Sequence, residues 1–175
     1  MDSKEIYIKA AFEKIIPLFR ESGLPIDEID ERIQIKYADI SPKWAGLCHS
    51  RISGYYPQEE HEILISNKID NGFDAIDMLI HEVCHAIQFH LYGDEVRPHG
   101  KEFKVIAEAV GLTGKMTRAS ANHELGIKII KWEKEIGVFP HEPSFAEMIE
   151  NWMINLINYG GSFYILAMIV QYNTP

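Results

Sequence analysis

One apolar stripe constrains the fold of this chain more than any other feature. Six apolar side chains recur at spacings of 3, 4, 3, 4 and 4 residues: Phe73, Ile76, Ile80, Val83, Ile87 and Leu91. This is the helical period, so the stripe predicts a helix of about five turns with one buried face. Asn71 or Asp70 can cap it, and Asp74 lies in its first turn, where the helix dipole favours negative charge. We expect this helix to be the centre of the fold.

Weaker patterns on both sides of the central helix indicate an α+β fold. A first amphipathic helix is predicted by Ile8, Phe12, Ile15 and Phe19, with Pro17 expected to bend its last turn. Three strand patterns follow at residues 33–37, 44–52 and 61–66, with a turn at 53–58 between the last two. We expect a small antiparallel sheet packed on the central helix. Residues 100–110 and 125–136 predict two further helices.

The length of 175 residues fits one domain with a modest appendage. Pro140 and Pro143 interrupt both helix and central strand, so we place a boundary there, with a main domain at 1–139 and an appendage at 140–175. The appendage is expected to be helical because apolar residues recur at helical spacing in it: Phe145, Ile149, Trp152 and Leu156.

Composition narrows the class of protein. The only cysteines, Cys48 and Cys84, are too few for a disulfide scaffold or a four-cysteine zinc ribbon, so a metal site would need histidine and carboxylate ligands. The longest apolar run, residues 163–170, is far shorter than the ~20 residues that a membrane span needs, and the N-terminus does not resemble a signal peptide. We therefore expect a soluble, cytoplasmic protein with no membrane partner.

The central helix carries the chemically informative motif, His81-Glu82-Val83-Cys84-His85. Composition alone would place an H-E-x-x-H pattern in this chain only roughly 0.04 times. Histidines four residues apart lie on one face of a helix, about one turn apart, so both imidazoles can reach one ion. Glu82 adjoins the first of them and can point at a metal-bound water. The motif predicts a zinc site with His81 and His85 as ligands and Glu82 as the catalytic base.

Catalytic zinc usually takes three protein ligands, so a third must be found. His90 lies roughly 180° around the helix from His81 and should face away. His99 is favoured, because the loop before it can turn back and a helix begins directly after it. Glu102 and Glu108 remain alternatives. We expect Cys84 to be a buried packing residue, and Asp77 to be an exposed carboxylate, with support of a histidine ligand as the alternative.

These residues together resemble the SprT-like zinc metalloprotease family, which includes the Spartan proteases. The resemblance rests on residues 81–85 and on His99-Gly100-Lys101-Glu102-Phe103, with weaker similarity at 45–48 and 63–66, and covers about Trp44 to Gly111. It implies a zincin-like domain in which His81, His85 and His99 hold one Zn2+ ion and Glu82 is catalytic. Many members carry a C-terminal four-cysteine zinc ribbon. This chain lacks one and is similar to small phage-encoded members, which would place it in the host cytoplasm.

The family resemblance implies a zinc-dependent metalloendopeptidase, that is, a hydrolase of peptide bonds in protein substrates and by extension in DNA-associated proteins. We expect the strand at 63–66 to edge the cleft, where Ile63, Leu64 and Ile65 would bind an extended substrate through main-chain hydrogen bonds. A second group to stabilise the oxyanion is not identified; Arg118 and His123 are candidates without a pattern that selects them.

Two other functions remain open. The domain could be a zinc-containing binding or regulatory module that cuts nothing. It could also bind nucleic acid through residues 97–134, which carry 8 basic and 4 acidic side chains although the whole chain has a net charge of −9. That overall charge opposes sequence-independent binding to phosphate by the chain as a whole.

Overall fold

The computed structural model describes residues 3–51 and 60–140. The chain divides into two compact units, Met1–His141 and Glu142–Pro175, and only the first falls within the described part. Its longer elements are α1 (Ser3–Glu21), β1 (Ile33–Ala38), β2 (Gly46–Arg51), β3 (Glu60–Ser66), α2 (Gly72–Tyr92), α3 (Lys101–Ala109) and α4 (His123–Ile136). The predicted turn at 53–58 and the predicted appendage helix lie outside the described residues. The α+β class is confirmed.

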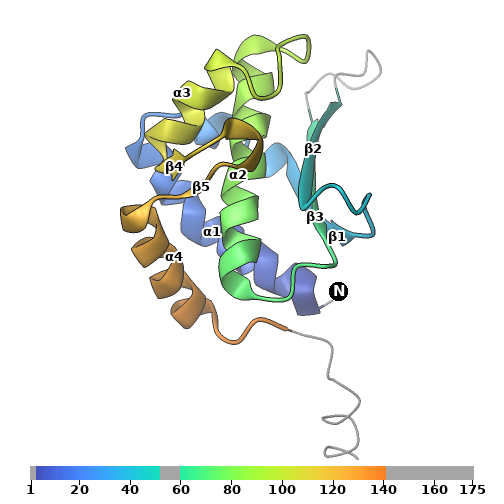
Figure 1. The fold of residues 1–175 in the computed structure, drawn as a ribbon, viewed down its shortest axis with the longest axis vertical. Coiled ribbons are helices and arrows are strands. Elements are labelled where there is room, and N and C mark those ends of the chain that lie inside the picture. The colour runs from blue at the N-terminus through green and yellow to red at the C-terminus, as the bar shows by residue number, and fades with distance from the viewer. Residues whose placement is uncertain (1–2, 52–59, 141–175) are drawn as a thin grey trace, which may run out of the picture. The chain divides into compact units, whose positions relative to one another are not determined.

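Helix α2 runs through the middle of the unit, with the sheet on one side and α3 and α4 on the other (Figure 1). The Asn71 side chain caps it by accepting a hydrogen bond from the Asp74 N–H at 2.8 Å. The helix ends at Gly93, whose φ of +79° lies in the left-handed region that favours glycine. The central helix that the apolar stripe predicts is confirmed within one residue at each end.

The three long strands form one sheet in the order β1-β3-β2. Strand β2 pairs with β3 in antiparallel fashion, but β1 pairs with β3 in parallel. The prediction of an entirely antiparallel sheet is therefore wrong. Alternation of apolar and polar residues reveals which face of a strand is buried, but it does not fix strand order or direction. On the buried face, Ile63 of β3 pairs with Ile35 of β1 and with Cys48 of β2.

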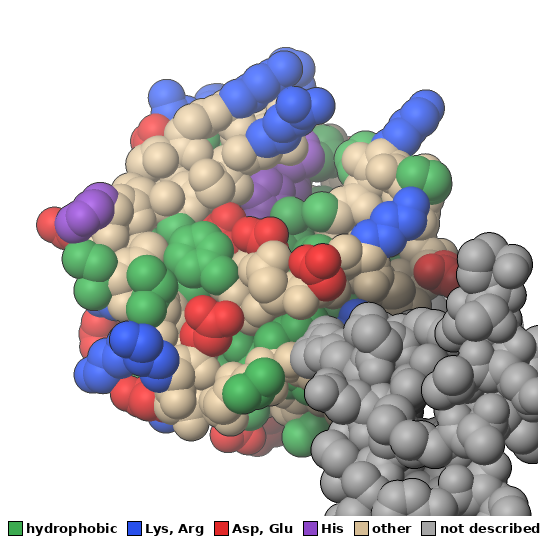
Figure 2. Space-filling model, turned by 60° about the horizontal axis from the view of Figure 1, so that its bottom comes forward, with side chains coloured by type: hydrophobic (Ala, Val, Ile, Leu, Met, Phe, Trp, Pro, Cys, Tyr) green, Lys and Arg blue, Asp and Glu red, His purple; other side chains and the backbone are tan. Residues whose placement is uncertain are grey.

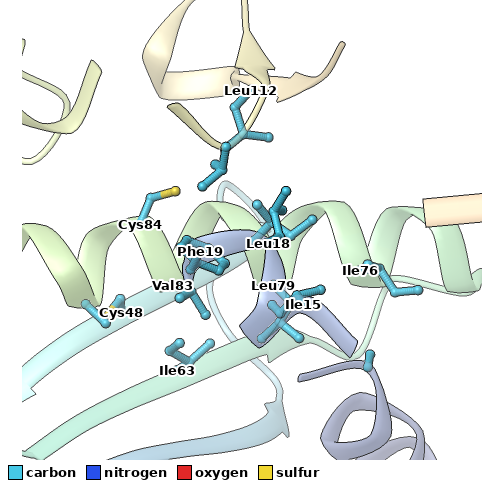
Figure 3. Close-up of a cluster of buried hydrophobic side chains, with 14 of the residues drawn as sticks. Ile15, Leu18, Phe19, Cys48, Ile63, Ile76, Leu79, Val83, Cys84 and Leu112 are labelled. Carbon is cyan, nitrogen blue, oxygen red and sulfur yellow. The ribbon is translucent and has the colours of Figure 1, made fainter. Parts of the chain in front are cut away.

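The core lies where α1, α2 and the sheet meet (Figure 3). Ile15 and Phe19 of α1, Leu79 of α2 and Ile63 of β3 are fully buried in it. Burial of each large apolar side chain stabilises the fold by roughly 1.5–3 kcal/mol. This packing joins α1, which continues through Pro17 to Glu21, to the helix that carries the histidines. His81 and His85 therefore stand on a well-packed helix.

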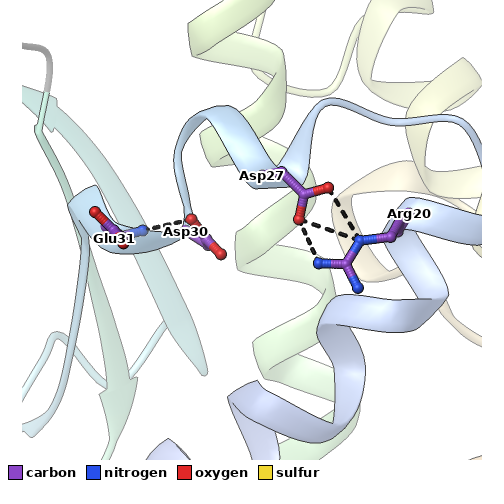
Figure 4. A network of polar contacts seen from close by, with 4 residues as sticks. All are labelled: Arg20, Asp27, Asp30 and Glu31. Atoms are coloured by element: carbon purple, nitrogen blue, oxygen red, sulfur yellow. Dashed lines mark hydrogen bonds and ion pairs between the residues drawn. The ribbon is translucent and has the colours of Figure 1, made fainter.

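Two short helical turns, Ile26–Glu28 and Asp30–Arg32, connect α1 to β1. Arg20 at the end of α1 donates from both Nε and Nη2 to the carboxylate of Asp27, and the Asp30 side chain accepts from the Glu31 N–H (Figure 4). Arg20 and Asp27 are more than half exposed, so this ion pair contributes little to stability. It restricts the direction in which the chain leaves α1.

A short hairpin between α3 and α4 has no counterpart among the predicted elements. Strands β4 (Leu112–Thr113) and β5 (Ser120–Ala121) pair in antiparallel fashion around a helical turn at Met116–Arg118. Gly111 has a φ of +94°, and its carbonyl accepts from the N–H of Asn122, whose side chain caps α4. Strands of two residues are too short to produce a periodic pattern, which explains why the sequence did not reveal them.

Candidate metal centre

The helical phase of α2 places two imidazoles beside a third from the following loop. The Nε2 atom of His99 lies 3.3 Å from Nε2 of His81 and 3.1 Å from Nε2 of His85. The ligand atoms of all three residues lie within 4.8 Å of one another. In the part of the chain that the structure describes, histidine, cysteine and carboxylate side chains come close enough to hold a metal ion at this cluster of three histidines. The structure thus brings together the three histidines predicted from the sequence.

His99 reaches the cluster because the chain turns sharply before α3. The N–H of Gly100 donates to the carbonyl of Arg97 at 2.9 Å, which closes a turn around His99. Helix α3 then begins at Lys101 and packs against α2. The loop from Gly93 therefore returns the third imidazole to the face of α2 that carries the first two.

Burial keeps the three imidazoles in their neutral form. Burial first, and then the charge of the neighbouring histidines, lowers the pKa of His81 to about 4 and that of His85 to about 3. Burial also lowers the pKa of His99. At neutral pH each ring therefore has one nitrogen with a free lone pair, and three such nitrogens close together form a cation site.

The spacing of these nitrogens fits zinc. Zinc bonds imidazole nitrogen at about 2.0–2.1 Å with tetrahedral geometry, which separates neighbouring ligand nitrogens by about 3.3 Å. The Nε2 atom of His99 lies 3.1 and 3.3 Å from those of His85 and His81, which is close to that value. Three neutral nitrogen ligands with no thiolate suit zinc better than the hard cations calcium and magnesium, which prefer oxygen.

Glu82 is buried beside the cluster, at the boundary between α2 and the start of β2. Its side chain is only 4% exposed, and burial raises the pKa of its carboxyl to about 8. A Cβ atom added to Gly46 would lie 2.6 Å from Oε1 of Glu82, so the carboxylate lies directly against the β2 backbone. A carboxyl with a pKa near neutrality can both accept and release a proton under physiological conditions.

Phe103 forms an aromatic surface under the three histidines. Its fully buried ring lies 4.2 Å from the ring of His85, 5.0 Å from that of His81 and 5.1 Å from that of His99, measured between centroids. The helix predicted at 100–110 includes Phe103, but nothing in its pattern connected this residue to the histidines. Its position four residues after His99, on the first turn of α3, was the available signal.

Gln88 is the other site residue that sequence reasoning missed. Its side chain is fully buried and contacts both His85 and the turn that carries His99. It lies three residues after His85, where side chains on a helix are neighbours, and a polar residue on that buried face was the available signal.

The other sequence candidates lie elsewhere. His90 faces away, as predicted, with Nε2 3.1 Å from a carboxylate oxygen of Glu28. Glu102 and Glu108 are not part of the cluster, and Glu108 is exposed on α3 next to Lys104. Cys84 is fully buried, and burial raises the pKa of its thiol, which confirms a packing role.

Asp77 matches neither expectation for it. It is partly buried, and its Oδ1 accepts a hydrogen bond from the N–H of Ala121 at 2.8 Å, which ties β5 to α2. Burial raises the pKa of this carboxyl to about 6, against the opposing effect of that hydrogen bond. The helical position of Asp77 suggested an exposed residue because the β4–β5 hairpin that covers it could not be predicted.

The prediction that Ile63, Leu64 and Ile65 bind substrate through their main chain is wrong. Strand β3 is the central strand, with β1 hydrogen-bonded on one side and β2 on the other. Its main chain is already paired, and Ile63 and Ile65 are fully buried. The run of apolar residues at 63–65 instead reflects the central place of this strand in the sheet.

Figure 2 shows histidine side chains within a recess of the surface, with lysine and arginine side chains on one rim. All eight basic residues between 97 and 134 are exposed. Three of them form ion pairs with nearby glutamates: Lys101, Lys104 and Lys131.

None of the helices in the described part of the chain is long and apolar enough to cross a membrane.

Fold and site together define an α+β domain of metallopeptidase type, with three clustered histidines and a buried carboxylate next to them. The profile of the SprT-like family matches residues 19–123, and the chain belongs to that family. Domains of this family are zincin-like, so the expected fold and family are both confirmed. The match extends beyond residues 44–111, where the resemblance was first seen, into α1 and the start of α4. No curated protein matches the chain.

Proposed function

We propose that this protein is a zinc metalloendopeptidase that hydrolyses peptide bonds within protein substrates. The observation that carries the proposal is the convergence of three neutral imidazoles beside a buried carboxylate. His81, His85 and His99 would hold the ion, and Glu82 would be the catalytic residue. A zinc ion bound there would supply positive charge that makes water nucleophilic near neutral pH and polarises a carbonyl group.

Glu82 would move the proton in this reaction. Its carboxylate would accept a proton from the attacking water and then donate it to the departing amine. Burial raises the pKa of Glu82 to about 8 when no cation is present, and a divalent cation nearby would favour the ionised, basic form. The carboxyl can therefore serve as a base in one half of the reaction and as an acid in the other.

The substrate chain would lie along β2, which replaces β3 in this role. Among the described strands, β2 is the edge strand on the side away from β1. It packs against α2, and its first residue contacts Glu82. A terminal strand can add an extended peptide through main-chain hydrogen bonds. Such pairing reads the shape of the chain more than its sequence, so we expect broad sequence tolerance and a requirement for unfolded or extended segments.

Replacement of Glu82 by glutamine tests the proposed hydrolysis. The variant removes the proton acceptor and keeps the size of the side chain, so cleavage of an unfolded protein substrate should fall by roughly 100-fold or more while zinc content is unchanged. The matched control is Glu108→Gln, an exposed carboxylate on α3, which should leave cleavage intact. Full cleavage by the Glu82→Gln protein would refute a hydrolase. Zinc without cleavage in the wild-type protein would favour the non-catalytic metal-binding module.

Zinc content tests the assigned ligands. Elemental analysis should find one zinc per wild-type chain and substantially less in His99→Ala, because two remaining ligands hold the ion poorly. His90→Ala is the control, since His90 contacts Glu28 and not the cluster. Equal zinc in wild type and His99→Ala would exclude His99 as a ligand.

The family resemblance extends the proposal to DNA-associated protein substrates. Figure 2 shows lysine and arginine side chains on one rim of the recess, and a phosphate backbone could contact them there. Five of the exposed basic residues between 97 and 134 have no ion pair in the described part of the chain. Such contacts would give affinity for DNA that falls steeply as salt rises. A weak response independent of salt would limit the substrate class to proteins away from nucleic acid.

A further inference from the structure

Gln88 is a fully buried amide in contact with two parts of the histidine cluster. Its Oε1 lies 3.3 Å from Nδ1 of His85, and its Nε2 donates to the carbonyl of Arg97 at 3.0 Å. Arg97 begins the turn that carries His99. One side chain thus joins a histidine of α2 to the loop that supplies the third histidine. A buried amide costs stability unless both of its ends are hydrogen-bonded, and here both are.

The contact to Arg97 fixes which way round the amide lies. A backbone carbonyl can only accept hydrogen bonds, so the end of Gln88 that faces Arg97 must be the NH2 group. The end that faces His85 is then the carbonyl oxygen, which also can only accept. Nδ1 of His85 must therefore carry the hydrogen for this contact to be favourable.

That protonation state determines where the free lone pair of His85 lies. A neutral imidazole with hydrogen on Nδ1 has its lone pair on Nε2. This is the atom that lies 3.1 Å from Nε2 of His99. Gln88 thereby directs the lone pair of His85 into the centre of the cluster before any ion arrives.

The second hydrogen bond of Gln88 restrains His99. The Arg97 carbonyl accepts from Gln88 and also from the Gly100 N–H, so the turn around His99 is closed and attached to α2 at the same atom. Without the amide of Gln88, only the Gly100 bond would hold this carbonyl. His99 is the least buried of the three histidines, so its position depends most on such a tether.

We propose that Gln88 is a positioning residue that selects the Nδ1–H tautomer of His85 and tethers the His99 turn, and so sets the metal affinity of the site. The proposal rests on the proposed metal site but not on hydrolysis. Groups that orient a metal-bound histidine typically change metal affinity by 10- to 100-fold when removed. Because Gln88 holds two of the three ligands, we expect its loss to fall within this range.

The tautomer can be measured without metal and without activity. Long-range ¹H–¹⁵N spectra of the metal-free, full-length wild-type protein at pH 7 should show hydrogen on Nδ1 of His85. Gln88→Leu should lose this preference and bind zinc 10- to 100-fold more weakly in competition with a chromophoric chelator.

Ile87→Val is the matched control. Ile87 is fully buried on α2 next to Gln88, so the variant also disturbs packing but leaves the polar contacts intact. It should keep both the tautomer and the wild-type zinc affinity. Hydrogen on Nε2 of His85 in the wild-type protein, or unchanged zinc affinity in folded Gln88→Leu, would overturn the proposal. The wild-type spectrum decides the tautomer even where a variant fails to fold. A wild-type protein that shows the tautomer yet binds no zinc would overturn the proposed metal function instead.

Discussion

The carboxylate of Glu82 lies against the backbone of Gly46. A Cβ atom at position 46 would be 2.6 Å from Oε1 of Glu82 and 2.8 Å from both Cγ and Sδ of Met78. These separations are shorter than carbon contacts in folded proteins allow, so only glycine fits without movement. Strand β2 and the face of α2 that carries Glu82 approach each other closely because this residue has no side chain.

Gly46→Ala should therefore displace the Glu82 carboxylate while leaving the fold and the histidines in place. The atoms that a methyl group would meet are the ends of flexible side chains, which can move at modest cost. A displacement of about 1 Å in a catalytic group can lower the rate by roughly 100-fold. We expect cleavage to fall by about this factor with zinc content unchanged.

Gly126→Ala is the control for this substitution. Gly126 lies within α4, where an added Cβ would meet only Cζ of Phe73, at 3.9 Å. Alanine favours a helix over glycine by about 1 kcal/mol, so this variant should be as stable as the wild type or more so, with normal cleavage. Normal cleavage by Gly46→Ala as well would contradict the role assigned to this close approach.

Phe103→Ala should weaken both the fold and the metal site. Its ring is fully buried and contacts all three histidine rings, and truncation of a buried phenylalanine costs roughly 3–5 kcal/mol of unfolding free energy. Denaturant unfolding and zinc titration measure the two effects. Val105→Ala on the same helix, 66% exposed, should change stability by no more than about 0.5 kcal/mol. Wild-type zinc affinity in a folded Phe103→Ala protein would show that the ring supports the core alone.

The buried carboxyl of Glu82 should make the metal-free protein less stable as pH rises. Its pKa is about 8 in the folded protein and 4.5 in its ordinary state, so the folded protein retains a proton that the unfolded chain has lost. The contribution of the Glu82 carboxyl to the free energy of unfolding is fully present below pH 4.5 and is lost as pH rises to 8. Between pH 6.5 and 8 the loss should be roughly 2 kcal/mol.

Glu82→Gln should abolish that part of the pH dependence because glutamine does not titrate. Comparison of the two metal-free proteins by denaturant unfolding cancels the contribution of the histidines, which both contain. The difference in unfolding free energy should shift in favour of the glutamine variant as pH rises. A difference that stays constant from pH 5 to 8 would mean that the Glu82 carboxyl has an ordinary pKa.

Features with strong local periodicity were the ones the sequence predicted well. The stripe from Phe73 to Leu91 predicted α2, and helical geometry then placed His81 and His85 side by side. The position of His99 followed from a short loop and the start of a helix. These inferences needed only distances along the chain, because the residues concerned lie on one helix or directly after it.

Features that depend on contacts between distant segments could not be predicted. The central place of β3 depends on hydrogen bonds to β1 and β2, which are separate segments of the chain. The sequence does not reveal this pairing, so Ile63, Leu64 and Ile65 were wrongly predicted to bind substrate. Asp77 is covered by a hairpin of two-residue strands, and Gly46 approaches Glu82 from 36 positions away. Neither residue belongs to a local pattern that reveals its partner.

Zinc should stabilise the folded protein in proportion to its affinity for the histidine cluster. A ligand that binds only the folded state adds about 2.7 kcal/mol of unfolding free energy at 100 times its dissociation constant. Thermal unfolding of the metal-free protein should therefore shift to higher temperature when zinc is added, and a chelator should reverse the shift. His90→Ala should retain the shift, whereas His99→Ala should lose most of it, because only the second removes a nitrogen from the cluster. An equal shift in both variants would place the ion elsewhere in the protein, and no shift in the wild type would exclude a metal that depends on the native fold.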